Sequence, residues 1–181
     1  MAEDEKITLF IGRLSLGKGL QYLIAAWPAV KALFSSAKLL FIGSGNEEPC
    51  LKQQVLDLGL KNSVIFKGAI PNDQLPVYYS AADVFVLPSI LTQQGQEGMP
   101  VVIIEALLSG CWVIASKIGG VADLSGMAAV KTVVPENTKE LSEKITQCLR
   151  QGRPAFDQRI NNFTLSAAAL AYAQKYQELI N

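Results

Sequence analysis

Short apolar runs alternate with amphipathic stretches along nearly the whole chain, and this alternation constrains the fold more than any other feature. Each run has the length of a strand, and each stretch has the length of a helix. Two of the runs, Leu39–Ile42 and Val84–Leu87, are apolar at every position, which is typical of strands buried on both faces of a parallel sheet. The sequence therefore predicts an α/β fold, a Rossmann-like parallel sheet with helices on both faces.

The predicted strands share a short apolar core that ends at a loop rich in glycine or polar residues. They are Ile7–Ile11, Lys38–Ile42, Val64–Phe66, Val84–Leu87, Trp112–Ala115 and Val130–Val134. The predicted helices share apolar residues at helical spacing, and they are Leu20–Phe34, Glu48–Leu58, Asn72–Ser80, Val101–Ser109, Thr138–Arg150 and Leu165–Leu179. The segment Gln151–Pro154 has the composition of a linker, so it is expected to separate the core from the last helix.

Length and composition favour one globular domain that covers residues 1–181. Half of the residues are hydrophobic and 18% are charged. No apolar run approaches the roughly 20 residues that a membrane-spanning helix needs, so no transmembrane segment is expected. The short acidic start, Met1–Lys6, lacks the features of a signal peptide, which predicts a cytoplasmic location.

Charge and side-chain chemistry exclude several classes of function. Sixteen basic residues balance sixteen acidic ones, so no overall field attracts nucleic acid. The three cysteines, Cys50, Cys111 and Cys148, are far apart in the sequence, which argues against a zinc site or a disulfide framework. The chain has no histidine, which excludes a Ser-His-Asp triad, a Cys-His pair and histidine metal sites. Acid-base chemistry must therefore come from carboxylates, lysine or tyrosine, or from outside this chain.

The first strand-end loop, Gly12–Gly19, has the features of a phosphate site. It follows a strand and precedes a helix, whose N-terminus favours an anion. Arg13 supplies a forked cation and Lys18 a point charge. The order of a Walker loop is absent, because Gly19 stands where a magnesium-binding hydroxyl residue is needed. The alternative is an ordinary strand-helix turn with two solvated cations.

Two glutamates with seven residues between them, Glu97 and Glu105, flank the start of the helix predicted at Val101. Pro100 suits the first position of that helix, and Glu105 is expected about one turn inside it. Carboxylates on both sides of a helix N-terminus can bind sugar hydroxyls while the backbone N–H groups face a phosphate. The alternative for Glu97 is a first-turn carboxylate that the helix dipole favours, and the alternative for Glu105 is an exposed helical acid.

Two other loops follow strands. Gly43–Gly45 lacks the third glycine of a dinucleotide fingerprint, because Glu48 stands there. This loop either packs under a nucleotide or sugar or is a plain tight turn. Gly119–Gly120 either offers backbone N–H groups to an anion or forms a simple turn.

A series of motifs occurs in a fixed order along the chain. The motifs are Phe10–Leu14, Lys18–Gly19, Phe41–Gly45, Val64–Gly68, Ala82–Ser89, Gln96–Ala106 and Gly119–Gly120. In this order they resemble the C-terminal, donor-binding half of the retaining glycosyltransferases of family 4, also called group 1. The resemblance covers nearly the whole chain. It implies one half of a two-domain GT-B architecture, and a hexosyltransferase that uses a UDP or GDP sugar.

The resemblance also implies roles for individual residues. Arg13 and Lys18 would hold the donor diphosphate and stabilise its departure, and Glu97 would bind the transferred sugar, which makes these three the catalytic residues. The substrate-binding residues would be Glu105 at the ribose hydroxyls, Gly98 and Met99 through their backbone N–H groups, Lys67 and Gly68 beside the base, and Gly12 and Gly43 in the strand-end loops. No cofactor or metal is implied, because preorganised cations and a helix N-terminus favour the charge on the leaving group.

By the same resemblance, the N-terminal acceptor-binding domain is missing from this chain. Residues 1–6 would be the remnant of the hinge, and residues 163–181 the terminal helix. The expected partners are a nucleotide sugar and that missing domain, which would make any contact with a membrane and bind a lipid- or saccharide-linked acceptor. The isolated chain is expected to bind a donor without transferring its sugar.

Two alternatives differ from this interpretation. The first is a stand-alone nucleotide-sugar-binding or scaffold module without transferase activity, which predicts a stable dimer or complex. The second is an epimerase or phosphorylase on the same architecture, which usually relies on more carboxylates and histidines. One departure from the family pattern is Cys111–Trp112, where a small residue and a proline are common. This change is expected to affect packing more than chemistry.

Overall fold

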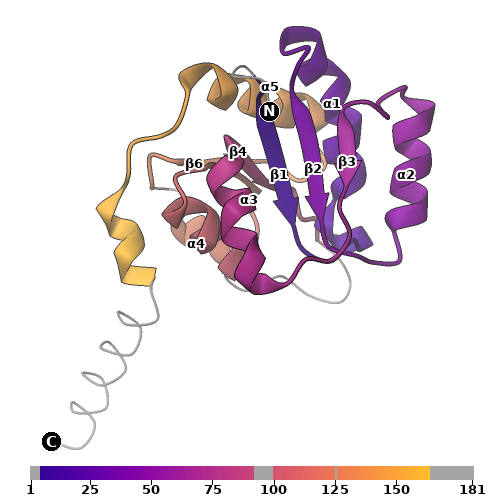
Figure 1. Cartoon of the computed structure of the whole chain (residues 1–181). Coiled ribbons are helices and arrows are strands. Elements are labelled where there is room, and N and C mark those ends of the chain that lie inside the picture. Colours follow the sequence, from indigo (N-terminus) through magenta and orange to yellow (C-terminus); the bar gives the residue numbers. More distant parts are fainter. Residues whose placement is uncertain (1–4, 92–99, 125, 164–181) are drawn as a thin grey trace, which may run out of the picture.

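The computed structural model describes residues 5–91, 100–124 and 126–163. These residues form a parallel sheet of six strands in the order β3-β2-β1-β4-β5-β6 (Figure 1). The strands are β1 (Ile7–Ile11), β2 (Lys38–Ile42), β3 (Val64–Phe66), β4 (Val84–Leu87), β5 (Trp112–Ser116) and β6 (Val130–Val133). Because all six are parallel, the loops that follow them lie at one edge, here called the carboxyl edge of the sheet.

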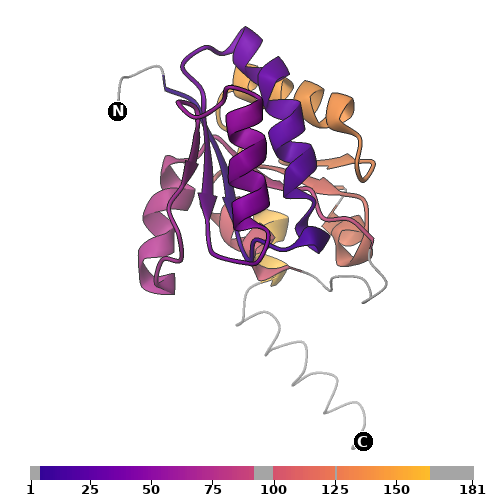
Figure 2. The same cartoon turned by 90° about the vertical axis from the view of Figure 1, so that its right-hand side faces the viewer.

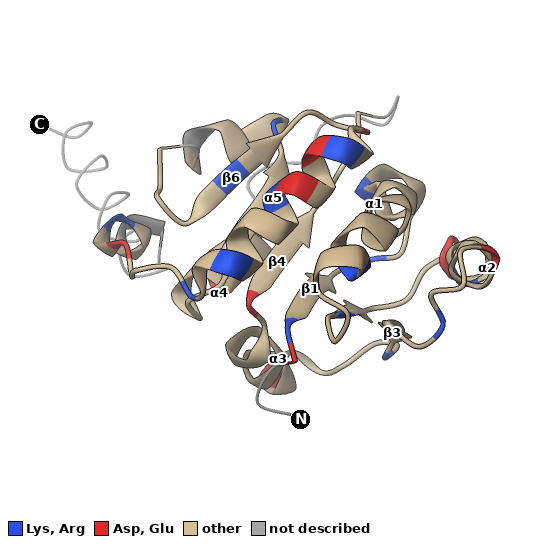
Figure 3. Ribbon diagram, turned by 90° about the horizontal axis from the view of Figure 1, so that it is seen from above, with Lys and Arg blue, Asp and Glu red and all other residues tan. Residues whose placement is uncertain are grey.

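Helices cover both faces of this sheet. They are α1 (Leu20–Leu33), α2 (Glu48–Asp57), α3 (Leu75–Ala81), α4 (Val101–Leu108) and α5 (Thr138–Gln151). On one face α1 packs against both α2 and α5, which lie beside it in Figure 2, while α3 contacts α4 on the other face. The view along the sheet in Figure 3 shows α1 and α3 on opposite sides of β1. The predicted three-layer fold is confirmed.

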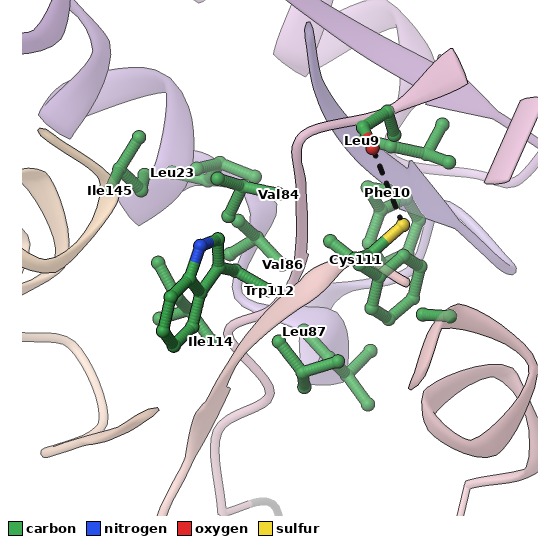
Figure 4. Close-up of a cluster of buried hydrophobic side chains, with 14 of the residues drawn as sticks. Leu9, Phe10, Leu23, Val84, Val86, Leu87, Cys111, Trp112, Ile114 and Ile145 are labelled. Atoms are coloured by element: carbon green, nitrogen blue, oxygen red, sulfur yellow. Dashed lines mark hydrogen bonds between the residues drawn. The ribbon is translucent and has the colours of Figure 1, made fainter. Parts of the chain in front are cut away.

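The core forms where the fully apolar strands predicted it. All residues of β1, β4 and β5 are buried, as expected for strands with helices on both faces. Figure 4 shows Leu9, Val84, Val86 and Trp112 among the side chains of this core. Each Å² of apolar surface buried in this core contributes roughly 25 cal/mol to stability.

The predicted elements differ from the structure mainly at their ends. The segment predicted as one helix from Asn72 divides into a short 3-10 helix, Asn72–Gln74, and α3. Pro100 is the residue before α4, with extended backbone angles, and not its first helical residue. The last predicted helix, Leu165–Leu179, lies outside the described residues.

The predicted linker is part of the packed structure. Gln151 is the last residue of α5, and the carbonyl of Gly152 accepts a hydrogen bond of 2.5 Å from the indole nitrogen of Trp112. The guanidinium of Arg153 donates to the carbonyls of Ser80, Ala82 and Ser109, at the ends of α3 and α4. Cations are favoured at helix C-termini. Arg153 therefore fixes the segment after α5 to the ends of α3 and α4, so this segment is not a free linker.

Asp83 joins the beginnings of two neighbouring strands. Its carboxylate accepts a hydrogen bond of 2.8 Å from the backbone N–H of Ile7 and forms an ion pair of 3.0 Å with Lys6. The contact lies at the opposite end of the strands from the carboxyl edge, so Asp83 has a structural role there. In the described parts of the chain, no helix combines the length and the apolarity needed to cross a bilayer.

Candidate functional site

Backbone hydrogen bonds join four strand-end loops at the carboxyl edge. The amide of Gly12 donates to the carbonyl of Ile42, and the amide of Gly43 donates to that of Gly68, at 3.0 and 2.8 Å. The amide of Ile90 donates to the carbonyl of Gly17 at 2.9 Å. The loops after β1, β2, β3 and β4 therefore form one connected layer, whose edge is marked by the arrowheads of β1 and β2 in Figure 1.

Gly43 has an observed packing role in this layer. Its φ of 131° lies in a region that favours glycine, and a Cβ built on it would lie 1.9 Å from the carbonyl oxygen of Gly12. A side chain at this position would push the β1 and β2 loops apart. Of the two alternatives for this loop, close packing within the layer is what the structure shows, while its contact with a donor stays a prediction.

The loop after β1 holds the two predicted cations. A short 3-10 helix, Leu16–Lys18, ends at Gly19, whose left-handed conformation (φ 64°) starts α1. Lys18 is partly buried, whereas Arg13 is exposed. The pKa of Lys18 is lowered, first by burial and second by the positive charge of Arg13. Two cations held close enough to oppose each other's charge suit an anionic ligand, which removes that repulsion.

Glu105 is part of a hydrogen-bonded pair. It lies in the second turn of α4, is partly buried, and accepts a hydrogen bond of 2.7 Å at Oε2 from the hydroxyl of Tyr79 in α3. The alternative of an exposed helical acid is therefore wrong. Its other carboxylate oxygen, Oε1, has no hydrogen-bond partner within the described ranges of the chain.

Three of the predicted site residues, Glu97, Gly98 and Met99, lie outside the described residues. Their roles stay predictions. The structure therefore describes two parts of the predicted site: the cationic loop after β1, and Glu105 on the helix that follows β4. Both follow strands that pair with each other, since β1 and β4 are neighbours in the sheet.

Lys67 and Gly68 follow β3 at the same edge, two strands away from β1. Lys67 is exposed and lines a groove of about 350 Å³ on the α3 side of the sheet, together with Leu40, Ile65 and Tyr78. That groove also reaches Ile7, at the beginning of β1, so it extends away from the carboxyl edge. The role of Lys67 beside a base stays a prediction.

Gly119 and Gly120 begin a 3-10 helix, Gly119–Leu124, that connects β5 to β6. Whether their backbone N–H groups receive an anion or only form a turn stays a prediction. Within the described residues, no group of three His, Cys, Asp or Glu side chains is placed to hold a metal ion.

Tyr79 is the described residue beside the site that sequence reasoning missed. Its side chain is 2% exposed and packs in the core. Its hydroxyl, however, reaches a glutamate 26 positions away. The signal available in the sequence was a tyrosine at a buried helical position, because a buried phenol needs a hydrogen-bond partner.

The family is decided by comparison with known proteins. The model of the family "Glycosyl transferases group 1" matches residues 1–164. This chain belongs to the group 1 glycosyltransferases. A relative is an uncharacterized glycosyltransferase of Methanocaldococcus jannaschii, which is 37% identical over 122 residues, or 67% of this chain and 30% of the relative. The chain spans about a third of the length of the curated relatives that it matches.

Solved glycosyltransferase structures share the fold. The sucrose-phosphate synthase of Thermosynechococcus elongatus superposes with a TM-score of 0.83 at 31% identity, over 99% of this chain and 47% of the synthase. The Anabaena protein HepE, in a complex with UDP and glucose, superposes with a TM-score of 0.70 at 29% identity, over 81% of this chain and 39% of HepE. The six-stranded sheet thus matches the Rossmann-like domain of GT-B glycosyltransferases.

Proposed function

We propose that this chain is the donor-binding domain of a retaining glycosyltransferase, and that it binds a nucleoside-diphosphate sugar at the carboxyl edge of the sheet. The observation that carries the proposal is the position of two cations, Arg13 and the partly buried Lys18, in the loop after β1 at the carboxyl edge. Burial and, second, the charge of Arg13 lower the pKa of Lys18. A diphosphate bound there would be neutralised by both cations next to the N-terminus of α1.

The proposed reaction depends on charge. When the bond between the sugar and the diphosphate breaks, the nucleoside diphosphate leaves with an additional negative charge. Arg13 and Lys18 would stabilise this charge, because preorganised cations act most strongly where charge develops. In this proposal they do so without a metal ion, and no other cofactor takes part. The catalytic set is completed by Glu97 at the transferred sugar, with Gly98 and Met99 donating backbone N–H groups.

Glu105 is the proposed ligand of the ribose. Its Oε1 has no hydrogen-bond partner within the described residues, and a carboxylate can accept hydrogen bonds from two neighbouring hydroxyls. The complex of HepE with UDP and glucose supports a nucleotide sugar as the ligand class. A UDP sugar and a GDP sugar both fit the proposal, and the base is placed near Lys67 and Gly68.

Transfer needs an acceptor site that we place outside this chain. The chain covers about a third of its curated relatives and 47% of the synthase, which leaves room in those proteins for a second domain. In the proposal that domain is N-terminal, faces the donor site across a cleft and binds a lipid- or saccharide-linked acceptor. Donor binding is then the activity to test in the chain itself.

The test is isothermal titration calorimetry of the chain with UDP, GDP and ADP, with magnesium and with EDTA. One nucleotide is expected to bind in both buffers. The variant Lys18→Ala is expected to weaken it roughly tenfold to hundredfold, since a charge-assisted hydrogen bond contributes about 1.5 to 3 kcal/mol. Lys61→Ala is the matched control, because Lys61 is exposed in the loop before β3, at the far edge of the sheet.

Two results would contradict the proposal. If no nucleoside diphosphate binds, or if Lys18→Ala binds as well as Lys61→Ala, the anion site is wrong. The first result, no binding of any nucleoside diphosphate, would fit the scaffold alternative, which predicts a stable dimer or complex. Light scattering on the eluted protein would distinguish that dimer from a monomer.

A further inference from the structure

The hydroxyl of Tyr79 is fixed against Glu105 from a neighbouring helix. The hydrogen bond to Oε2 measures 2.7 Å and joins α3 to α4. The tyrosine is 2% exposed, while the glutamate is only partly buried. The donor thus lies inside the core and the acceptor at its margin, so the core side of the pair is the rigid side.

Three contacts keep Tyr79 in place. Its ring lies at a tilt of 50° to the ring of Phe85 in β4, with the ring centres 5.8 Å apart. Its backbone carbonyl accepts a hydrogen bond of 3.1 Å from the thiol of Cys111, the residue before β5. The next turn of the chain is held as well, because the amide of Ala82 donates to the carbonyls of Tyr78 and Tyr79. The ring contact and the fixed backbone together limit how far the phenol can turn away from Glu105.

The chemistry of the pair keeps the hydrogen-bond direction constant. Burial raises the pKa of Tyr79 well above its usual value, and the hydrogen bond with Glu105 raises it further. The phenol therefore stays protonated at physiological pH, and it donates its hydrogen bond to Glu105. Glu105 accepts at Oε2 and presents Oε1, which has no partner within the described residues, away from this bond.

We propose that Tyr79 is a positioning residue for nucleotide recognition: its hydroxyl holds one oxygen of Glu105 so that the other oxygen meets the ribose hydroxyls. The inference rests on the proposed function, because Glu105 is a ribose ligand only if the chain binds a nucleotide. It assigns ribose selectivity to a residue that does not touch the ligand. The fixed carboxylate loses less conformational entropy when it binds than a freely rotating one would.

The test compares ribonucleotides with their 2′-deoxy forms. Affinities for UDP, GDP and ADP, and for dUDP, dGDP and dADP, are measured by calorimetry on wild type and Tyr79→Phe. For the nucleotide that binds, wild type is expected to prefer the ribose form. Tyr79→Phe is expected to bind that form roughly fivefold to tenfold more weakly and the deoxy form unchanged, so the preference shrinks. Tyr78→Phe is the matched control, because it removes a hydroxyl from the neighbouring residue of the same helix.

Two further variants separate positioning from a general structural role. In Glu105→Gln, adding Tyr79→Phe is expected to change the ribose preference no further, since the tyrosine acts through the glutamate. Phe85→Leu keeps the hydroxyl but loosens the ring, and it is expected to reduce the preference in the same direction. This variant carries the test if Tyr79→Phe does not fold.

The outcomes distinguish the two proposals. If wild type binds no nucleoside diphosphate, the proposed function fails and the positioning role fails with it. If wild type shows the ribose preference and Tyr79→Phe retains it in full, only the positioning role is overturned. Equal weakening of the ribose and deoxy forms would also overturn it, because that pattern indicates a general loss of structure.

Discussion

The indole nitrogen of Trp112 donates a hydrogen bond of 2.5 Å to the carbonyl oxygen of Gly152, and so ties the first residue of β5 to the residue after α5. The ammonium of Lys131 lies 5.1 Å from the centre of the same indole ring. The side chain of Trp112 therefore connects β5, β6 and the end of α5. The expectation that Cys111–Trp112 acts on packing agrees with these contacts.

Trp112→Phe is expected to lower the free energy of unfolding by about 1 to 3 kcal/mol. The change removes the hydrogen bond and weakens the cation–π contact, while the ring stays apolar. Urea unfolding followed by circular dichroism measures the loss. Val134→Ala, at an exposed position, serves as the control and should change little. A Trp112→Phe variant as stable as wild type would show that the contact with Gly152 contributes nothing.

Gly43→Ala is expected to cost about 3 kcal/mol of stability, because the new Cβ would lie 1.9 Å from the carbonyl oxygen of Gly12. Gly59→Ala is the matched control. Gly59 also has a positive φ, of 66°, but nothing lies within 4 Å of its Cβ position. Its substitution should cost only the backbone strain of about 1 to 2 kcal/mol. Equal losses in the two variants, measured by thermal unfolding, would contradict the close packing of the β1 and β2 loops.

Lys18 is expected to make diphosphate binding sensitive to alkaline pH. Its pKa lies below the usual 10.5 because of burial and, second, because of Arg13. In the free protein it therefore loses its proton at a lower pH than an exposed lysine does. Affinity for a nucleoside diphosphate should therefore fall at a pH below 10.5, the value at which an exposed lysine loses its proton. In Lys18→Met, the calorimetric affinity should be weak throughout and lack this decrease; the same decrease in the variant would assign it to another group.

The lowered pKa of Lys18 also predicts how the stability of the protein depends on pH. In the unfolded chain Lys18 keeps its proton up to about 10.5, whereas the folded protein releases it earlier. The charged form thus costs stability below the folded pKa, and this cost is relieved as pH rises toward 10.5. The stability of wild type relative to Lys18→Met should therefore increase over that window in urea unfolding. A difference that stays constant with pH would contradict the shift.

The cysteines are expected to differ in reactivity. Cys50 is exposed, while Cys111 and Cys148 are buried, and burial raises the pKa of both buried thiols to about 11. Since the thiolate is the nucleophile, a disulfide reagent such as DTNB at neutral pH should modify Cys50 quickly in the folded protein. Modification of Cys111 and Cys148 should need unfolding. Mass spectrometry of the labelled peptides checks the order.

The raised pKa values of the buried thiols also predict the direction in which stability changes at alkaline pH. They release their protons near pH 11 in the folded protein and near 9.0 in the unfolded chain. The unfolded state therefore binds fewer protons between these values, and stability falls as pH rises through this window. Cys148→Ala should reduce the slope of that fall. An unchanged slope would show that other groups cause it.

Much of the fold could be predicted because its signals are local. The runs at Leu39–Ile42 and Val84–Leu87 are apolar at every position, so they identify strands covered on both faces, and the structure buries them. Errors occurred where the signal was weak. The helix predicted from Asn72 divides at Gln74, and the supposed linker is fastened by Arg153, whose carbonyl partners no local pattern can specify.

The candidate site also has a part that local sequence patterns predict and a part that they do not. Arg13 and Lys18 were predicted from one loop, because strand, glycine, cation and helix follow each other in the sequence. The contact between Tyr79 and Glu105 was not predicted, since the two residues come from different helices. No local sequence pattern around either residue indicates the other as its hydrogen-bond partner.

The sequence by itself determined the parallel α/β class, the positions of the strand-end loops and the residue types at the carboxyl edge. These depend on the period of apolar residues and on backbone preferences, which act over a few neighbours. Only the tertiary structure decided that Gly12 meets Gly43, that Trp112 meets Gly152 and that Tyr79 meets Glu105. Such contacts arise when helices and loops pack across a twisted sheet, and packing depends on the shapes of all the side chains together.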